Sequence, residues 1–85
     1  MDVLRELESR IENTVGEEQR GWVKKYEEYL SAEIKLDVIR KSNEKNPICY
    51  LDSGEITYKT YSEKEKEKIL IELEGLKLKI EKSLN

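Results

Sequence analysis

The chain has 85 residues, of which 36% are hydrophobic and 41% are charged. A chain of this length forms one domain whose core needs nearly every large apolar side chain, which leaves few for a deep ligand pocket. The 19 acidic and 16 basic residues are mixed along the chain and give a net charge of −3, so it lacks the basic face that nucleic-acid binding requires.

The first predicted element is a short helix over residues 1–15. Val3, Leu7 and Ile11 recur at steps of four residues, which is typical of one face of a helix. Thr14 and Glu17 then have the spacing of a capping box, in which the threonine hydroxyl accepts the backbone N–H of the glutamate. We therefore expect a corner here and a second helix directly after it.

The second predicted element is a long helix over residues 17–43, which ends before Pro47. Apolar residues form two stripes on it. The first stripe is Val23, Tyr26, Leu30, Ile34 and Val38, and the second is Tyr29, Ala32, Leu36 and Ile39. Together they cover more than the apolar face of an ordinary surface helix. We expect this helix to be central and to be contacted on two sides.

Residues 48–61 are predicted to form an antiparallel β-hairpin. A three-residue loop, 52–54, would place four large side chains on one face: Ile48, Tyr50, Ile56 and Tyr58. A two-residue loop of Ser53 and Gly54 would scatter the apolar side chains over both faces. We favour the three-residue loop and expect the four side chains to pack against the two long helices.

The last predicted element is a helix over residues 62–84. Ser62 is the expected N-cap, with Glu65 at capping-box spacing. The charged run 63–68 is typical of a solvated surface, and the apolar stripe behind it is Ile69, Leu73, Leu76, Ile80 and Leu84. The predicted fold is a small single α+β domain of three helices, with one antiparallel β-hairpin between the second and third helices.

The residue combinations that common catalytic and metal sites need are missing. Histidine is absent and Cys49 is the only cysteine, so the chain offers no nitrogen and sulfur ligand set for zinc and no partner to activate the thiol. The four glycines stand alone, which excludes a glycine-rich phosphate loop. We therefore expect a protein that is not an enzyme, with no catalytic residues, cofactor, metal or small-molecule substrate.

Two surfaces remain as candidates for binding another protein. One is the outer face of the hairpin, with Leu51 and Tyr61. The other is a notch on the last helix, where Gly75 lies between Ile71 and Leu78. Isolated exposed apolar residues are common, but a helix that is apolar on two sides usually has two neighbours.

The stretch "GEITYKTYSEKEKEKILIELEGL" resembles the phage lambda W-like head-completion family. The resemblance rests on the Gly54 turn, the alternation of Ile56 and Tyr58, the Ser62 cap and the "LIELE" periodicity at 70–74. It implies two antiparallel helices packed over one hairpin, and a non-catalytic role in joining the portal region of a filled capsid to the tail. It also implies that five hairpin residues meet neighbouring subunits: Leu51, Asp52, Ser53, Glu55 and Lys59.

The leading functional hypothesis is a protein–protein interaction module, with phage assembly or head–tail joining as its most specific form. Its partner would be another protein or a second copy of the chain. The alternative is a regulator of nucleic acid machinery, either a winged-helix-like DNA binder or an acidic inhibitor protein. Charge disfavours nucleic acid, because Lys59 is the only cation in the would-be wing. Without a basic leader followed by an apolar run, or an apolar span, we expect no membrane association. The expected location is the cytoplasm, or the virion if the protein derives from a phage.

Overall fold

The computed structural model describes residues 2–85, except for the side chain of Asp52. The elements follow in the order α1 (Val3–Glu12), α2 (Gly16–Lys41), β1 (Ile48–Asp52), β2 (Glu55–Lys59) and α3 (Glu63–Lys82). The two strands form an antiparallel sheet. The predicted α+β class and the predicted place of the hairpin between the second and third helices are therefore confirmed.

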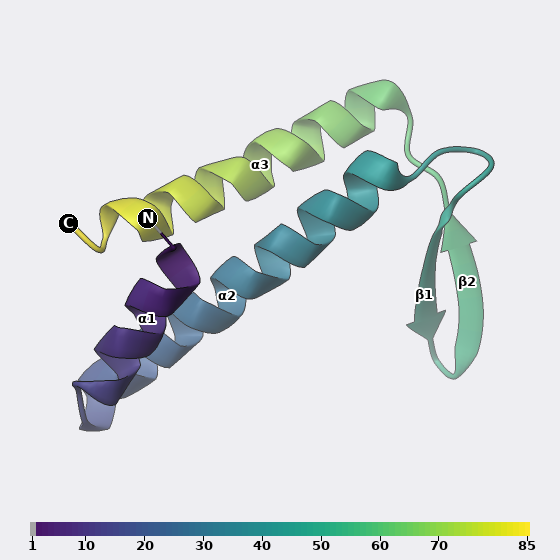
Figure 1. Ribbon diagram of the computed structural model, residues 1–85. Helices are drawn as coiled ribbons and strands as arrows, with labels where there is room; N and C mark the ends of the chain where they lie inside the picture. The colour runs from purple at the N-terminus through teal and green to yellow at the C-terminus, as the bar shows by residue number, and fades with distance from the viewer. Residues whose placement is uncertain (1) are drawn as a thin grey trace.

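The molecule is elongated, measuring 45 × 29 × 17 Å, and the hairpin lies at one end of it (Figure 1). Helices α2 and α3 run antiparallel and in contact, and α1 folds back along the beginning of α2 (Figure 1). The hairpin hangs from the other end of the α2–α3 pair, and both chain ends lie together at the end far from it. The molecule therefore has the outline of a hook.

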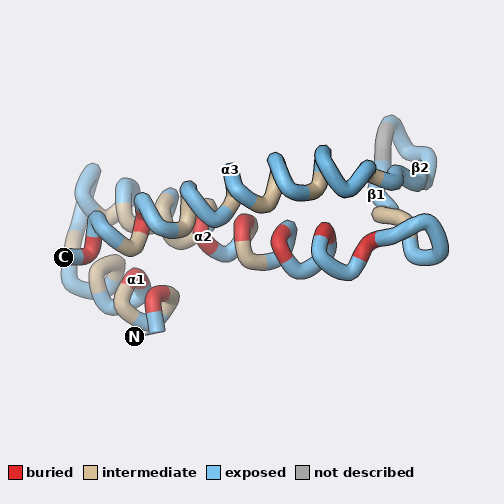
Figure 2. Tube along the Cα trace, turned by 90° about the horizontal axis from the view of Figure 1, so that it is seen from above, coloured by how far each residue is buried: buried red, intermediate tan, exposed pale blue. Residues whose placement is uncertain are grey.

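The core lies between the three helices. Its main cluster of buried side chains is Val3, Leu7, Tyr29, Ile80 and Leu84. The second predicted stripe of α2 is buried along its whole length, whereas three members of the first stripe are exposed: Leu30, Ile34 and Val38. Figure 2 shows the buried positions on the helices and an exposed hairpin. Along its C-terminal half, helix α2 is therefore covered by apolar neighbours on one side only.

The two predicted caps have different outcomes. The Ser62 hydroxyl accepts the backbone N–H of Glu65 at 3.2 Å, as predicted. The capping box at Thr14 is wrong, because the Thr14 hydroxyl instead donates to the Arg10 carbonyl oxygen at 2.7 Å. Helix α2 begins at Gly16, whose φ of +67° makes the corner that a residue with a Cβ would adopt only under strain.

Lys66 corrects the prediction that the charged run at the start of the last helix is solvated. Only 13% of its side chain is exposed. Its ammonium group donates to the carbonyl oxygen of Ser42 at 2.8 Å. Ser42 is buried and caps the C-terminus of α2, where a cation is favoured by the helix dipole. Lys66 therefore joins the first turn of α3 to the end of α2.

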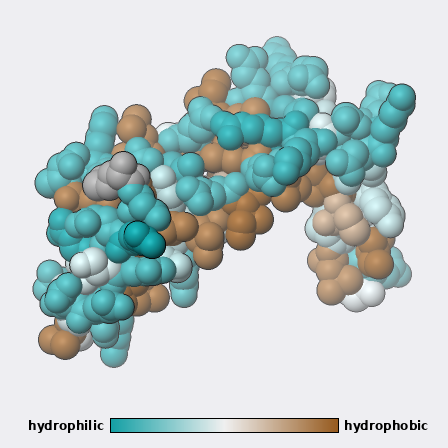
Figure 3. All heavy atoms as spheres, in the orientation of Figure 1, coloured by the Kyte–Doolittle hydropathy of each residue, from teal (hydrophilic) through white to brown (hydrophobic). Residues whose placement is uncertain are grey.

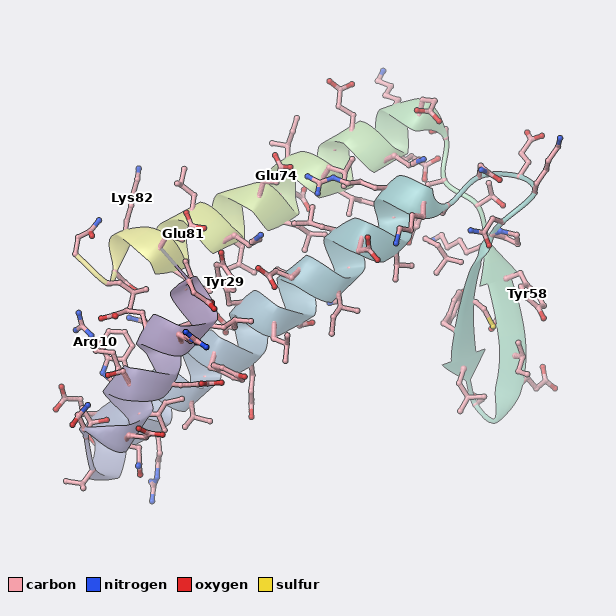
Figure 4. The ribbon with its side chains drawn as sticks, in the orientation of Figure 1. Arg10, Tyr29, Tyr58, Glu74, Glu81 and Lys82 are labelled. Carbon is pink, nitrogen blue, oxygen red and sulfur yellow. The ribbon has the colours of Figure 1, made fainter. Side chains whose placement is uncertain are left out.

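Tyr29 provides the corresponding polar contact at the other end of the helical pair. Its hydroxyl donates to Glu81 Oε1 at 2.7 Å (Figure 4). The ammonium group of Lys77 lies 5.0 Å from its ring centroid. Burial, the hydrogen bond to Glu81 and the negative charge of that carboxylate together raise the pKa of Tyr29 well above its ordinary value. The phenol is therefore held in its neutral form.

We expect Tyr29→Phe to lower the free energy of unfolding by about 1 kcal/mol at neutral pH, because it removes this hydrogen bond. Above pH 10, the ordinary pKa of tyrosine, the unfolded chain releases the phenolic proton while the native state keeps it. Wild-type stability then falls with rising pH, and the variant lacks this contribution. Urea unfolding at neutral pH and above pH 10 should show the difference shrinking. A constant difference would contradict this account.

Arg10 joins α1 to Trp22 of α2 and to the residues that follow α3. The Arg10 guanidinium donates to the carbonyl oxygen of Leu84 at 2.9 Å, and its centre lies 5.1 Å from the Trp22 ring centroid. The ammonium group of Lys25 lies 4.5 Å from the same ring. Cations over an indole face are attracted by its quadrupole, so the ring is held at the margin of the core.

The predicted register of the hairpin is wrong. The strands pair Leu51 with Ile56 and Cys49 with Tyr58, so the loop has two residues, Ser53 and Gly54. Their φ values are +50° and +83°. Two successive positive φ values give the turn whose twist matches that of the strands. The turn geometry therefore selects the register that the sequence analysis rejected.

The hairpin also does not pack as predicted. Ile56 and Tyr58 are 63% and 67% exposed, Tyr50 is exposed, and only Ile48 is half-buried. The reason lies in the connection from α2. The backbone groups of Asn43 and Asn46 bond to each other in both directions at 3.0 Å. This tight turn redirects the chain before the strands begin, so the hairpin leaves the helices instead of covering them.

Candidate protein-binding surface

The space inside the hook is a groove of about 610 Å³. Four α2 residues and three α3 residues line its helix side, and the exposed or half-buried apolar residues among them, which we call the helix wall, are Ile34, Val38, Ile69 and Leu73. Its hairpin wall is formed by Ile48, Tyr50 and Lys59, with Tyr61 at the root of the hairpin. In the space-filling view, apolar atoms gather along the underside of the helices and on the hairpin, with an open gap between them (Figure 3).

The helix wall is apolar because the first stripe of α2 finds no neighbour there. Ile34 is 56% exposed and Val38 is 42% exposed, although they lie one helical turn apart in the middle of the molecule. Ile69 and Leu73 of α3 continue this surface and are half-buried. Charged residues lining the groove include Lys35 and Glu72, one of each sign. The helix wall is thus an uncharged apolar strip, and the charges of Lys35 and Glu72 beside it are of opposite sign.

The hairpin wall is mixed in character. Ile48 and Tyr50 of β1 contribute its apolar part, and Lys59 of β2 lies opposite Ile48 in the register. The ammonium group of Lys59 is 4.7 Å from the ring centroid of Tyr61. This contact directs the lysine along an aromatic face, which leaves its charge partly compensated at the root of the groove.

The face of the hairpin that points away from the groove is a second apolar surface, which we call the ridge. It consists of Cys49, Leu51, Ile56 and Tyr58, two residues from each strand. In Figure 4, Tyr58 points away from the helices. Leu51 is 73% exposed and the Cys49 thiol is free and exposed. Residues directly opposite in a sheet are close enough for their side chains to touch, so the ridge is continuous across both strands.

Only part of the predicted binding set belongs to the groove and the ridge. Leu51 lies on the ridge, whereas Lys59 and Tyr61 line the groove. Ser53 and Glu55 lie at the turn and are exposed. The Asp52 side chain lies outside the described part of the structure. The hairpin residues of the prediction are thus divided among two faces and a tip.

The predicted notch on the last helix is on a separate surface. Ile71 and Leu78 are exposed, and the space beside Gly75 is open. These residues do not line the groove, whose α3 residues are on the opposite side of the helix. Beside Ile71, an ion pair between Arg40 and Glu74 links α2 and α3. The structure therefore does not bring the notch and the hairpin together.

The sequence pattern predicts that most groove and ridge residues lie in the core. These residues are Ile34, Val38, Ile48, Tyr50, Ile56, Tyr58, Ile69 and Leu73. The available signal was the double stripe of the second helix, which predicts two neighbours. The predicted second neighbour is the hairpin, whereas the structure leaves that place open.

Within residues 2–85, leaving out the Asp52 side chain, no group of three or more carboxylate or thiol side chains is placed to hold a metal ion. No helix in the same range is long and apolar enough to cross a membrane. In comparisons with known proteins, no family model, no curated protein and no solved structure matches this chain. A functional proposal therefore rests on the exposure, shape and charge of the groove and the ridge.

Proposed function

We propose that this chain is a non-catalytic protein–protein interaction module that binds its partner through the groove and the ridge. The observation that carries this proposal is the exposure of large apolar side chains on both faces of one small hairpin and on the facing helix wall. Exposed apolar surface gathered in this way is typical of interaction sites. An isolated two-stranded sheet is also marginally stable in water, so the hairpin gains stability when a partner covers it.

The most specific form of the proposal is a phage-type assembly protein that joins head and tail. The resemblance to the lambda W-like family supports it, together with two antiparallel helices connected through a hairpin and the Ser62 cap. The hairpin differs from what that resemblance implies, because it is turned away from the helices. A role in which the hairpin reaches toward a neighbouring subunit is consistent with that difference.

Ile34→Glu is expected to weaken partner binding at least tenfold, because it places a charge in the middle of the apolar helix wall. Ile71→Glu is the matched control, since it makes the same change at an exposed isoleucine on the opposite side of the helical pair. Both variants should unfold within about 0.5 kcal/mol of the wild type, because neither residue is in the core. Binding is measured by titration calorimetry against the portal and tail proteins and by sedimentation of the chain alone.

Full binding by Ile34→Glu would contradict the proposed surface. A chain that is strictly monomeric and binds none of these proteins would contradict the proposed function. Weakened binding by Ile71→Glu, with Ile34→Glu unaffected, would transfer the site to the notch.

A further inference from the structure

We infer that the groove is occupied by the ridge of a second copy of this chain, in a symmetric dimer whose two hairpins interlock. This inference rests on the proposed function, since it names the partner that the same surface binds. It follows because one chain carries both of the surfaces that such a contact needs, the groove and the ridge. The ridge and the hairpin wall of the groove are opposite faces of the same two strands.

The layers of such a dimer follow from the hook shape. If the hairpin of one copy enters the hook of the other, its ridge faces the partner's helix wall. Its inner face, with Ile48 and Tyr50, then meets the inner face of the partner's hairpin. The order of layers is helices, hairpin, hairpin, helices, and a two-fold axis relates the two halves. Both ridges and both helix walls are covered by this one contact.

The chemistry of the two surfaces favours a second copy over a charged partner. The ridge residues carry no charged group, and the helix wall of Ile34, Val38, Ile69 and Leu73 carries none either. Lys35, Lys59 and Glu72 also line the groove, so it holds two positive charges and one negative charge, and its apolar strip, not a charge of one sign, is the feature that the ridge matches. An uncharged ridge therefore fits this groove, and each copy of the chain supplies one.

The available area falls within the range of stable interfaces, which bury roughly 600–1,000 Å² per partner. Together with the neighbouring Leu30, the exposed side chains of the helix wall, the inner hairpin face and the ridge amount to on the order of 700 Å² per chain. A stable interface of standard size buries roughly 800 Å² per partner. A symmetric contact uses this surface twice and closes the assembly, whereas a head-to-tail contact leaves one groove and one ridge open at its ends.

The native Cys49 on the ridge allows a direct test. We introduce a cysteine at Ile34 or Val38, positions one helical turn apart, so that neighbouring registers of the ridge on the helix wall are sampled. Cys49 is on the hairpin face that points away from these residues, so it cannot reach them within one chain without rearrangement. Mild oxidation should therefore give a covalent dimer with two disulfides in at least one variant, since these bonds need closely spaced Cβ atoms.

Three controls identify the contact. The wild type should give no such dimer, because the two Cys49 residues lie on the outward faces of the two inner hairpin layers and point away from each other. Adding Cys49→Ser should abolish cross-linking of the Val38→Cys and Ile34→Cys variants. Ile71→Cys, which keeps Cys49, should not cross-link, because its side of α3 is outside the interface. Without oxidation, Ile34→Glu and Tyr58→Glu should each raise the dimer dissociation constant at least tenfold in sedimentation equilibrium.

A ladder of larger cross-linked species would overturn the symmetric dimer in favour of a head-to-tail assembly. A monomeric mass at every concentration, with no cross-link from either cysteine, would overturn self-association. If that monomer still binds a different protein in an Ile34-dependent manner, the proposed function stands and only the dimer fails. A monomer that binds nothing would overturn both.

Discussion

Leu7→Ala is expected to lower the free energy of unfolding by about 3 kcal/mol, which is typical of removing a leucine side chain from a core. Leu7 is the most deeply buried side chain, with 0% exposure, and it lies in the cluster that joins α1 to α2 and α3. A small domain has few other contacts to compensate for the cavity. Urea unfolding monitored by Trp22 fluorescence measures the loss, because that ring packs against the same cluster.

Leu51→Ala is the matched control, because the same atoms are removed from a side chain on the exposed ridge. Measured on the monomer at low concentration, it should change the free energy of unfolding by no more than about 0.5 kcal/mol. A loss below about 1 kcal/mol for Leu7→Ala would show that α1 opens separately from the rest of the molecule.

Lys66→Met is expected to lower the free energy of unfolding by about 2 kcal/mol. Methionine keeps an apolar stem of similar length but cannot donate to the carbonyl oxygen of Ser42, which remains buried without its charged donor. The change also removes a positive charge from the C-terminal end of the α2 dipole. Chemical denaturation followed by far-UV circular dichroism measures the loss across the helical part of the molecule.

Lys64→Met provides the comparison, since Lys64 is an exposed lysine of the same charged run. It should stay within about 0.5 kcal/mol of the wild type. Lys66→Arg should retain part of the stability, because a guanidinium can still donate to the carbonyl, although its planar shape differs. Equal losses for Lys64→Met and Lys66→Met would mean that the contact with Ser42 contributes nothing.

The elements could be predicted from the sequence because their signals are local. The recurrence of Val3, Leu7 and Ile11 reports the face of one helix, and the Ser62 cap depends on residues three positions apart. Such patterns need no knowledge of distant parts of the chain. The element order and the α+β class follow from them directly.

The predicted register of the hairpin is wrong because it assumes that one face of the hairpin is buried. That assumption requires large side chains to share a face. In this hairpin neither face is covered by the helices, so turn geometry decides instead. The positive φ of Ser53, a residue with a side chain, is a backbone property that composition does not reveal.

The candidate surface could be predicted only in part. The stripe containing Ile34 and Val38 was visible as a helix face that needs a neighbour, and the hairpin was the predicted one. The direction of the hairpin, however, depends on the backbone turn between Asn43 and Asn46. The burial of Lys66 could not be predicted from the sequence either. Its neighbours in the run are exposed, and only the meeting of two helix ends gives this one lysine a buried acceptor.

The position of residues 2 and 85 at the end of the molecule far from the hairpin has a practical consequence. A fluorophore, an affinity handle or a solid support attached at either terminus leaves the opening of the hook accessible. A short peptide joining the two ends would permit a circular permutant cut between Ser53 and Gly54. Such a molecule would keep the helical core and release β1 and β2 as separate tails, so that recognition by the hairpin can be switched off without touching a single side chain of the core.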